Sequence, residues 1–130
     1  MREVVSPAAL AELAAASGFS PAVRAGDFLF LTGATGGDIT GVMPEGAGNQ
    51  TRNALMKALA VIDAAGGAAQ CVVEMTSYHG GMDHHFDTVD AVVREVLGLP
   101  LPAWTAVEVA GLRRTGAVIE LRIVAYVPQV

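Results

Sequence analysis

The sequence predicts one α/β (α+β) domain over residues 1–130, with a single mixed β-sheet and two helices packed on one face. Three observations predict this fold class. Residues 49–65 and 86–97 carry apolar side chains at helical spacing. Short apolar runs between glycines have the composition of strands. The last run, residues 117–127, alternates between a purely apolar face and a mixed one.

The first residues predict a helical N-terminal extension over residues 1–18. Ser6 suits the N-cap, Pro7 the first turn and Gly18 the position past the helix end. The same stretch weakly resembles a signal peptide. Pro7 and Glu12 interrupt its apolar run, so we expect it to belong to the mature fold.

A β-hairpin and a loop are predicted next. The apolar run at residues 27–32 is typical of a buried strand, and residues 22–24 suit the strand before it. Residues 36–48 hold five glycines, a proline and two acidic residues. This composition predicts a surface loop, with a brief strand around Ile39.

Two helices and three strands are predicted for the rest of the chain. Asn49 suits the N-cap of the helix at 49–65, and two glycines at 66–67 end it. The two apolar helix stripes are Leu55, Ala58, Leu59 and Ile62, then Phe86, Val89, Val92, Val93 and Val96. The strands are expected at residues 71–78, 104–110 and 117–127.

The final strand predicts how the sheet is covered. Its odd-numbered side chains are all apolar, so we expect the two long helices to pack against them: Ile119, Leu121, Ile123 and Ala125. Its even-numbered side chains are mixed: Val118, Glu120, Arg122, Val124 and Tyr126. A mixed face of this kind is typical of a subunit contact or a wet cleft.

Composition excludes several function classes. Eight basic against thirteen acidic residues give a net charge of −5, which disfavours nucleic-acid binding. No apolar segment approaches the roughly 20 residues that span a bilayer, so no membrane partner is expected. Cys71 is the only cysteine, which excludes an intrachain disulfide. We expect a buried, inert thiol and a cytoplasmic protein.

The chain has more apolar residues than a small monomer can easily bury. Hydrophobic residues make up 52% of the sequence, and the mean hydropathy is +0.46. Small domains leave much of their surface exposed, so this surplus predicts symmetric self-association.

Several ordered segments closely resemble the RidA/YjgF family. They are FSPAVRAGDFLFLTGATG, QTRNALMKALAVIDAAGG, VVEMTSYHGGMDHHF, PAWTAVEVAGL and AVIELRIVAYV, which together extend from Phe19 to Val127. The resemblance implies a chorismate-mutase-like fold. It also implies a homotrimer whose sheets form a central barrel, with three small-molecule clefts between adjacent subunits.

Well-studied members of the family hydrolyse enamines and imines such as 2-aminoacrylate to ketoacids and ammonia. Their motif has a tyrosine, a serine, an asparagine, an arginine and a glutamate. Here those positions hold Phe19, Thr32, Asp90, Trp104 and Glu120. Only the glutamate is unchanged, and threonine replaces serine conservatively.

The exchange of arginine for tryptophan has the largest expected consequence. The family's arginine holds the substrate carboxylate through a bidentate pair. Trp104 has one N–H donor and no charge, but it can stack on a flat substrate or fill the cleft. Asp90 disfavours an anionic substrate further. We therefore do not expect the standard 2-aminoacrylate deaminase, and we place Trp104, Phe19, Asp90 and Ala106 among the substrate-binding positions.

Glu120 is the expected acid/base, because a half-enclosed carboxylate can orient water and move protons. The alternative is an ion pair with Arg122 or with a neighbouring subunit. Thr32 is expected to donate a hydrogen bond to substrate, or else to satisfy local backbone. A relocated anion contact is open to Arg122, Arg24 or the arginines at 113–114, which are otherwise solvated surface groups.

Histidine and aspartate cluster near the turn before the second long helix: His79, Asp83, His84, His85 and Asp87. His79 ends a strand near the expected cleft and is a candidate substrate donor or proton carrier. Asp83 suits the N-cap of the following helix. Adjacent histidines cannot easily converge on one ion, so no metal and no cofactor are expected.

Two function classes remain open. The first is a Rid-like hydrolase, deaminase or tautomerase acting on an enamine, an imine or a related planar substrate. Its catalytic residues would be Glu120 and Thr32, with His79 and Arg122 beside the substrate. The second is a non-catalytic trimer that binds a metabolite or a protein. The acidic charge argues against the ribonuclease activity described for some family members.

Overall fold

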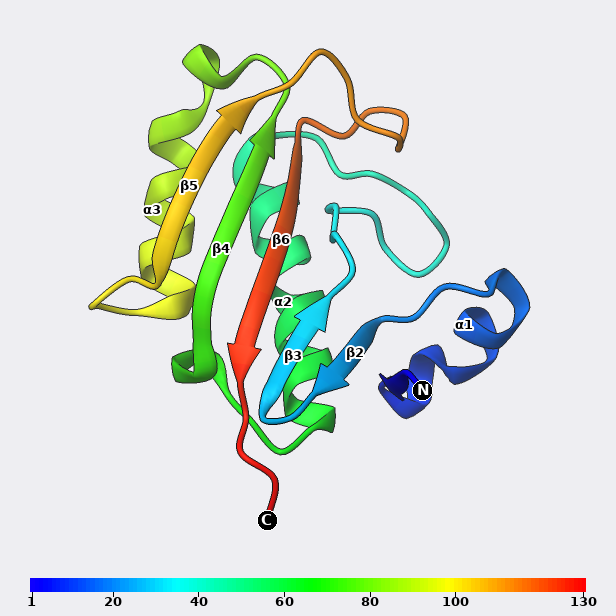
Figure 1. The fold of residues 1–130 in the computed structure, drawn as a ribbon. Coiled ribbons are helices and arrows are strands. Elements are labelled where there is room, and N and C mark those ends of the chain that lie inside the picture. The colour runs from blue at the N-terminus through cyan, green and yellow to red at the C-terminus, as the bar shows by residue number, and fades with distance from the viewer.

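The computed structural model describes residues 1–130 as one sheet with helices on a single face (Figure 1). Its strands are β1 (Glu3–Val5), β2 (Ala22–Ala25), β3 (Phe28–Leu31), β4 (Val72–His79), β5 (Ala103–Glu108) and β6 (Ile119–Tyr126). Its helices are α1 (Ala11–Ser17), α2 (Ala47–Ala64) and α3 (Phe86–Leu97), with 3-10 turns η1 (Ala8–Leu10), η2 (Ala69–Cys71) and η3 (Met82–His84). No helix has both the length and the apolar character needed to cross a membrane.

The strand order is β1-β2-β3-β6-β4-β5, so the last strand lies at the centre of the sheet. Only β4 and β5 run parallel, because α3 crosses over between them; every other neighbouring pair is antiparallel. In Figure 1, α2 and α3 lie behind the sheet, while α1 lies beside β2. This confirms the predicted mixed sheet with two long helices on one face.

The core lies between β6 and the two long helices. The odd-numbered side chains of β6 are at most 1% exposed: Ile119, Leu121, Ile123 and Ala125. Leu55 and Ile62 of α2 and Val89 and Val93 of α3 are fully buried beside them. Both predicted helix stripes therefore face the sheet as expected. Burying such side chains contributes about 1.5–3 kcal/mol each.

One buried amide joins α2 to the start of β6. Gln50 is 3% exposed, and its Oε1 accepts from the N–H of Val118 at 2.9 Å. Its Nε2 donates to the carbonyls of Pro44 at 2.9 Å and Gly116 at 3.0 Å. Because Gln50 takes the N–H of Val118, β6 begins at Ile119, two residues later than predicted. These three hydrogen bonds, which we call the Gln50 clamp, thus fix the start of the strand that carries Glu120.

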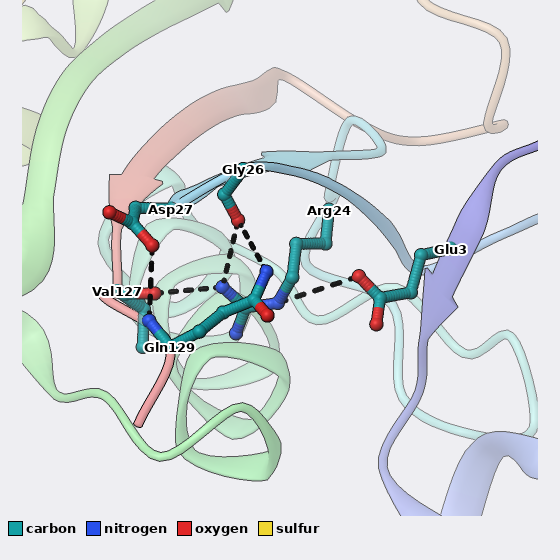
Figure 2. A network of polar contacts seen from close by, with 6 residues as sticks. All are labelled: Glu3, Arg24, Gly26, Asp27, Val127 and Gln129. Atoms are coloured by element: carbon teal, nitrogen blue, oxygen red, sulfur yellow. Dashed lines mark hydrogen bonds and ion pairs between the residues drawn. The ribbon is translucent and has the colours of Figure 1, made fainter.

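Arg24 joins the β2–β3 hairpin to the end of the chain (Figure 2). Its Nη1 donates to the carbonyl of Val127 at 2.8 Å, and its Nε lies 3.9 Å from a carboxylate oxygen of Glu3. Gln129 donates to Asp27 and Gly26 in the same network. The side chain of Arg24 is only 9% exposed, so its role is structural.

The N-terminal extension differs from its prediction. Residues 3–5 form β1 and pair with β2, so the first 18 residues are not only helical. Ser6 donates to the carbonyl of Pro7 and does not cap α1, which begins after η1 at Ala11. Gly18 does end the helix, with a positive φ of 79°.

Neither predicted N-cap is formed by its side chain. Asn49 lies inside α2 and donates to the carbonyl of Glu45, while Gly46, with φ of 88°, precedes the helix. Asp83 lies in η3, and α3 starts only after His85. In both places the chain turns through a glycine with positive φ, which shifts the register of the helix start.

Two local predictions are wrong. The predicted strand around Ile39 is a turn, because Asp38 Oδ1 accepts from the N–H groups of Thr40 and Val42. The hydrogen bond from the Thr40 hydroxyl, and then that from the N–H of Val42, hold the pKa of Asp38 below its usual value. Cys71 ends η2 rather than starting a strand, and it is half-buried at the core edge instead of fully buried.

The Gln50 clamp makes a stability prediction. Gln50→Met keeps the side-chain length but leaves buried N–H and carbonyl groups without partners. We expect it to lower the free energy of unfolding by about 2–4 kcal/mol in urea titrations. Asn49→Met is the matched control, because Asn49 is exposed and donates one bond. Equal stability of the two variants would contradict a clamping role for Gln50.

Candidate functional site

A hollow of about 530 Å³ opens on the helix-free face of the sheet, and we call it the sheet-face hollow. It is lined by Leu31, Thr32, Gly33, Tyr78, Val109, Gly111, Leu112, Arg113, Glu120 and Arg122. Three of the predicted site residues therefore share one surface: Thr32, Glu120 and Arg122. The hollow is formed where β3, β4 and β6 meet the loop after β5.

Glu120 is the only carboxylate in this hollow, and no protein group binds its oxygens. It faces away from the helices on β6, with Tyr78 of β4 directly opposite. Arg122 is not its partner, because Arg122 Nη1 lies 3.9 Å from a carboxylate oxygen of Glu74 instead. Within one chain, the alternative of a Glu120–Arg122 ion pair is therefore wrong. The carboxylate remains available to a ligand.

Gly33 makes the space that the Glu120 carboxylate occupies. A Cβ atom at this position would overlap with the Glu120 side chain, because it would lie only 2.4 Å from Oε2. Any side chain at residue 33 would have to displace the carboxylate. The glycine that follows β3 is thus a positioning feature, and sequence reasoning treated it only as the end of a strand.

Thr32 lies in the hollow, but its hydroxyl proton is already used. Thr32 Oγ1 donates to the carbonyl of Ser20 at 2.5 Å, and its N–H donates to the carbonyl of Pro21. This bond matches the alternative that Thr32 satisfies local backbone, and a contact of Thr32 with substrate stays a prediction. Its oxygen can still accept a hydrogen bond. Thr32 also fixes the segment after Phe19, which is itself 39% exposed.

Two of the four candidate arginines line the hollow, whereas Arg24 and Arg114 do not. Arg113, in the loop after β5, and Arg122, on β6, line it together with Glu120. Arg24 is held by Val127 and Glu3 on another part of the sheet (Figure 2), so it is excluded as an anion contact. The sheet-face hollow therefore offers two guanidinium groups and one carboxylate.

Trp104 lies on the opposite face of the sheet from Glu120. It pairs in register with Met75, so its side chain points toward the helices, as does that of Ala106 beside Ser77. The indole stacks on Phe86 of α3, with ring centroids 5.6 Å apart and an angle of 24°. Within one chain, Trp104 and Ala106 are thus separated from Glu120 by the sheet.

His79 also faces the helices, so it does not lie in the sheet-face hollow. It is fully buried, and its Nε2 lies 2.7 Å from Ser77 Oγ. Its Nδ1 lies 3.2 Å from His85 Nε2, and Trp104 Nε1 donates to Ser77 Oγ at 2.8 Å. These four side chains form one hydrogen-bonded line, which we call the His–Ser–Trp chain. The sequence predicts His79 beside the substrate, and within one chain the sheet separates His79 from Glu120.

His85 borders a second hollow of about 530 Å³, the outer hollow, between the first turns of α2 and α3. It is lined by Gly46, Ala47, Gly48, Asn49, Arg52, His84, His85, Thr88 and Val92. Arg52 there forms an ion pair with Glu95. No group of three or more His, Cys, Asp or Glu side chains is placed to hold a metal ion.

Asp90 also lies outside the sheet-face hollow. It lies on α3, one turn after Phe86, and its carboxylate accepts from Arg94 Nε at 2.9 Å. This i,i+4 pair balances the negative charge that the sequence suggested would repel an anion. Asp90 therefore belongs to the Trp104 side of the sheet.

The rest of the helix-free face is divided into an apolar and a polar half. Phe28, Phe30 and Tyr126 are 41%, 44% and 43% exposed, and Val4 and Val124 lie on the same side. Phe28 and Tyr126 contact edge to face, with centroids 5.2 Å apart. We call these five residues the apolar sheet patch. Glu74, Thr76 and Thr105 make the other half polar.

One mixed sheet, helices on a single face and an unpaired carboxylate in a hollow on the other define a class of small α+β ligand-binding proteins. The family profile described as Endoribonuclease L-PSP matches residues 9–127. The chain therefore belongs to this family, whose members carry the names YjgF, RutC and RidA. The resemblance noted in the sequence is confirmed.

Curated relatives and solved structures agree with this assignment. The RutC family protein YjgH of Escherichia coli K12 is 32% identical over 129 residues, covering 98% of this chain and 97% of that protein. A solved structure of protein YjgH has a TM-score of 0.87 and covers 99% of this chain and 98% of its own. RidA from an Antarctic Psychrobacter has a TM-score of 0.78 at 30% identity, covering 84% of this chain and 88% of its own.

The histidine pair predicts how stability depends on pH. Burial and then the neighbouring His85 lower the pKa of His79, and burial and then His84 lower that of His85, from an ordinary value of 6.5. The unfolded chain therefore binds protons at a higher pH than the folded protein does. This contribution to stability is complete above about pH 7 and is lost as the pH falls below 6.5.

Urea titrations between pH 8 and pH 5 check this sign. We expect the free energy of unfolding to decline on acidification, by at most about 1.4 kcal/mol per pH unit for each histidine. His79→Gln should flatten the decline. His84→Gln removes the smaller of the two causes that lower the pKa of His85 and neither of those that act on His79, so it should retain most of the decline. A stability that rises toward pH 5 would contradict the argument.

Proposed function

We propose that this protein is a Rid-type hydrolase that acts on an enamine, an imine or a related planar substrate, with Glu120 as the acid/base. The observation that carries the proposal is the free carboxylate of Glu120 above Gly33, in a hollow large enough for a small molecule. The alternative is a trimer that binds a metabolite without catalysis. That alternative draws support from Trp104, which carries no charge. A cytoplasmic location also stays a prediction.

Imine hydrolysis needs the two actions that a half-enclosed carboxylate can perform. Water adds its oxygen to the C=N carbon, and the nitrogen receives a proton. The resulting carbinolamine then loses ammonia and leaves a carbonyl compound. Glu120 would take a proton from the attacking water and return it to the nitrogen. Arg113 and Arg122 are the groups in the hollow that can hold an anionic part of the substrate.

We propose further that the complete site is assembled from two copies of the chain. Glu120 and Trp104 lie on opposite faces of one sheet, so they can share a cleft only if the Trp104 of one copy approaches the Glu120 of another. Trp104 lies on β5, which is an edge strand and thus accessible to a neighbour. The apolar sheet patch supports self-association, since three half-exposed aromatic rings would otherwise meet water.

The oligomer makes the first prediction from this proposal. Phe30→Glu places a charge in the centre of the apolar sheet patch, and we expect sedimentation velocity to show monomers in place of trimers. Met56→Glu is the matched control, because Met56 is 48% exposed on α2, on the other side of the sheet. Monomeric wild-type protein at micromolar concentration would contradict the two-copy site.

Ammonia release tests the catalytic proposal. The protein is incubated with 2-aminoacrylate generated in situ and with a panel of other enamines and imines. For any substrate that is turned over, Glu120→Gln should reduce the rate by about 10²–10⁴-fold, because the amide cannot carry the proton. Glu12→Gln changes an exposed carboxylate on α1, far from the hollow, and should keep the rate close to that of the wild type. If no compound is hydrolysed faster than without protein, the non-catalytic alternative is favoured.

A further inference from the structure

The His–Ser–Trp chain is a line of polar side chains within a largely apolar core. Ser77 and His79 are both 0% exposed, on the face of β4 that also carries Met75. An unpaired polar group at such a depth would cost about 1–3 kcal/mol. No buried side-chain nitrogen or oxygen in this protein lacks a hydrogen-bond partner, and this holds for the His–Ser–Trp chain as well. The polar atoms of these side chains bond to one another.

The direction of the hydrogen bonds follows from the indole. Trp104 Nε1 can only donate, so Ser77 Oγ accepts from it. The hydroxyl proton of Ser77 has one acceptor within reach, His79 Nε2 at 2.7 Å. His79 Nδ1 then carries a proton and donates to His85 Nε2 at 3.2 Å. This arrangement uses every donor and leaves the second proton of the pair on His85 Nδ1, at the outer hollow.

The same contacts fix the indole in place. Its N–H is held by Ser77, and one ring face lies against Phe86, which also contacts the ring of His79 at a centroid distance of 5.8 Å. The remaining, half-exposed part of Trp104 consists of ring carbons. A ligand that meets Trp104 therefore finds a rigid, flat and uncharged surface with no free donor.

We propose that Ser77, His79 and His85 are positioning residues that hold Trp104 as a flat wall of the substrate cleft and occupy its N–H. The site then accepts a flat, uncharged portion of the substrate beside the indole. This inference rests on the proposed function only in placing Trp104 at the cleft.

Protonation of His85 would reverse the direction of the hydrogen bonds between the side chains of His85, His79 and Ser77. An imidazolium donates from both nitrogens, so His85 Nε2–H would donate to His79 Nδ1, and His79 Nε2–H would donate to Ser77. Several ionisable side chains lie near these histidines, and none is hydrogen-bonded to them. Glu108 accepts from the N–H of Met82, Asp90 accepts from Arg94, and Arg52, which borders the outer hollow with His85, is paired with Glu95. Asp83, His84 and Asp87 are exposed, and His84 acts on His85 only through its charge. The state of His85 is therefore transmitted to Trp104 through Ser77.

Trp104 is the only tryptophan, so tryptophan fluorescence reports on the His–Ser–Trp chain. In wild-type protein we expect the emission to change with pH as the histidines titrate, below about pH 6.5. Ser77→Ala should abolish that response and raise the quenching of Trp104 by acrylamide, because the indole is released. Ser77→Thr keeps the hydroxyl and should restore both. His84→Gln leaves every hydrogen bond of the His–Ser–Trp chain in place and removes only the smaller cause that lowers the pKa of His85, so the pH response should persist.

A matched pair of neutral probes tests the ligand class. Benzamide and cyclohexanecarboxamide carry the same amide, but only benzamide is flat. Ligand-observed NMR should show tighter binding of benzamide to the wild type, although the cyclohexyl group has more apolar surface. Trp104→Leu should lose that preference, and Ser77→Ala should weaken it.

Three results would overturn the proposal. The first is wild-type emission, quenching and pH response in Ser77→Ala; if that variant does not fold, an unchanged response in His79→Gln has the same meaning. The second is a failure of Ser77→Thr to restore the response. The third is equal affinity for the two amides, or a preference for cyclohexanecarboxamide. These readouts need no catalysis, so an inactive Glu120 would leave them unaffected.

Discussion

The two faces of β6 are the constraint on which the rest of the structure depends. The strand lies at the centre of the sheet, and its odd-numbered side chains are apolar and buried against α2 and α3. Because side chains alternate along a strand, its even-numbered side chains must then point to the opposite face. Glu120 and Arg122 are thereby placed on the face that no helix covers. A one-residue shift of β6 would bury both charges in the core.

The sheet also acts as a partition between the two halves of the proposed site. Glu120, Thr32 and Arg113 border the sheet-face hollow, whereas Trp104, His79 and Asp90 lie on the side of the helices. No movement of side chains within one chain can bring the two groups together. The apolar sheet patch and the edge position of β5 both favour a neighbouring copy as the missing part. In this proposal, the contact that joins two copies of the chain also completes the site.

Buried polar side chains decide details that hydrophobic patterning does not reveal. Gln50 lies in an otherwise regular helix, yet it fixes the start of β6 through three hydrogen bonds. Ser77 shares the buried face of β4 with Met75, and this polar residue in an apolar register was a signal that sequence reasoning passed over. The sequence singled out His79 as a residue beside the substrate, and the structure places it on the face that the helices cover. The bonds of Gln50 to Val118 and of Ser77 to Trp104 join residues that are distant in the sequence.

The sequence by itself determined the mixed sheet, the two long helices, the face of β6 that they cover and the family. These features depend on periodicity and on ordered motifs, which are local properties of the chain. Only the tertiary structure decided that Glu120 is unpaired and that Arg24 has a structural role. It also decided that the Thr32 hydroxyl donates to a backbone carbonyl and that Trp104 donates to Ser77. Those properties depend on which distant groups come within about 3 Å of one another, and residue type and spacing do not encode such distances.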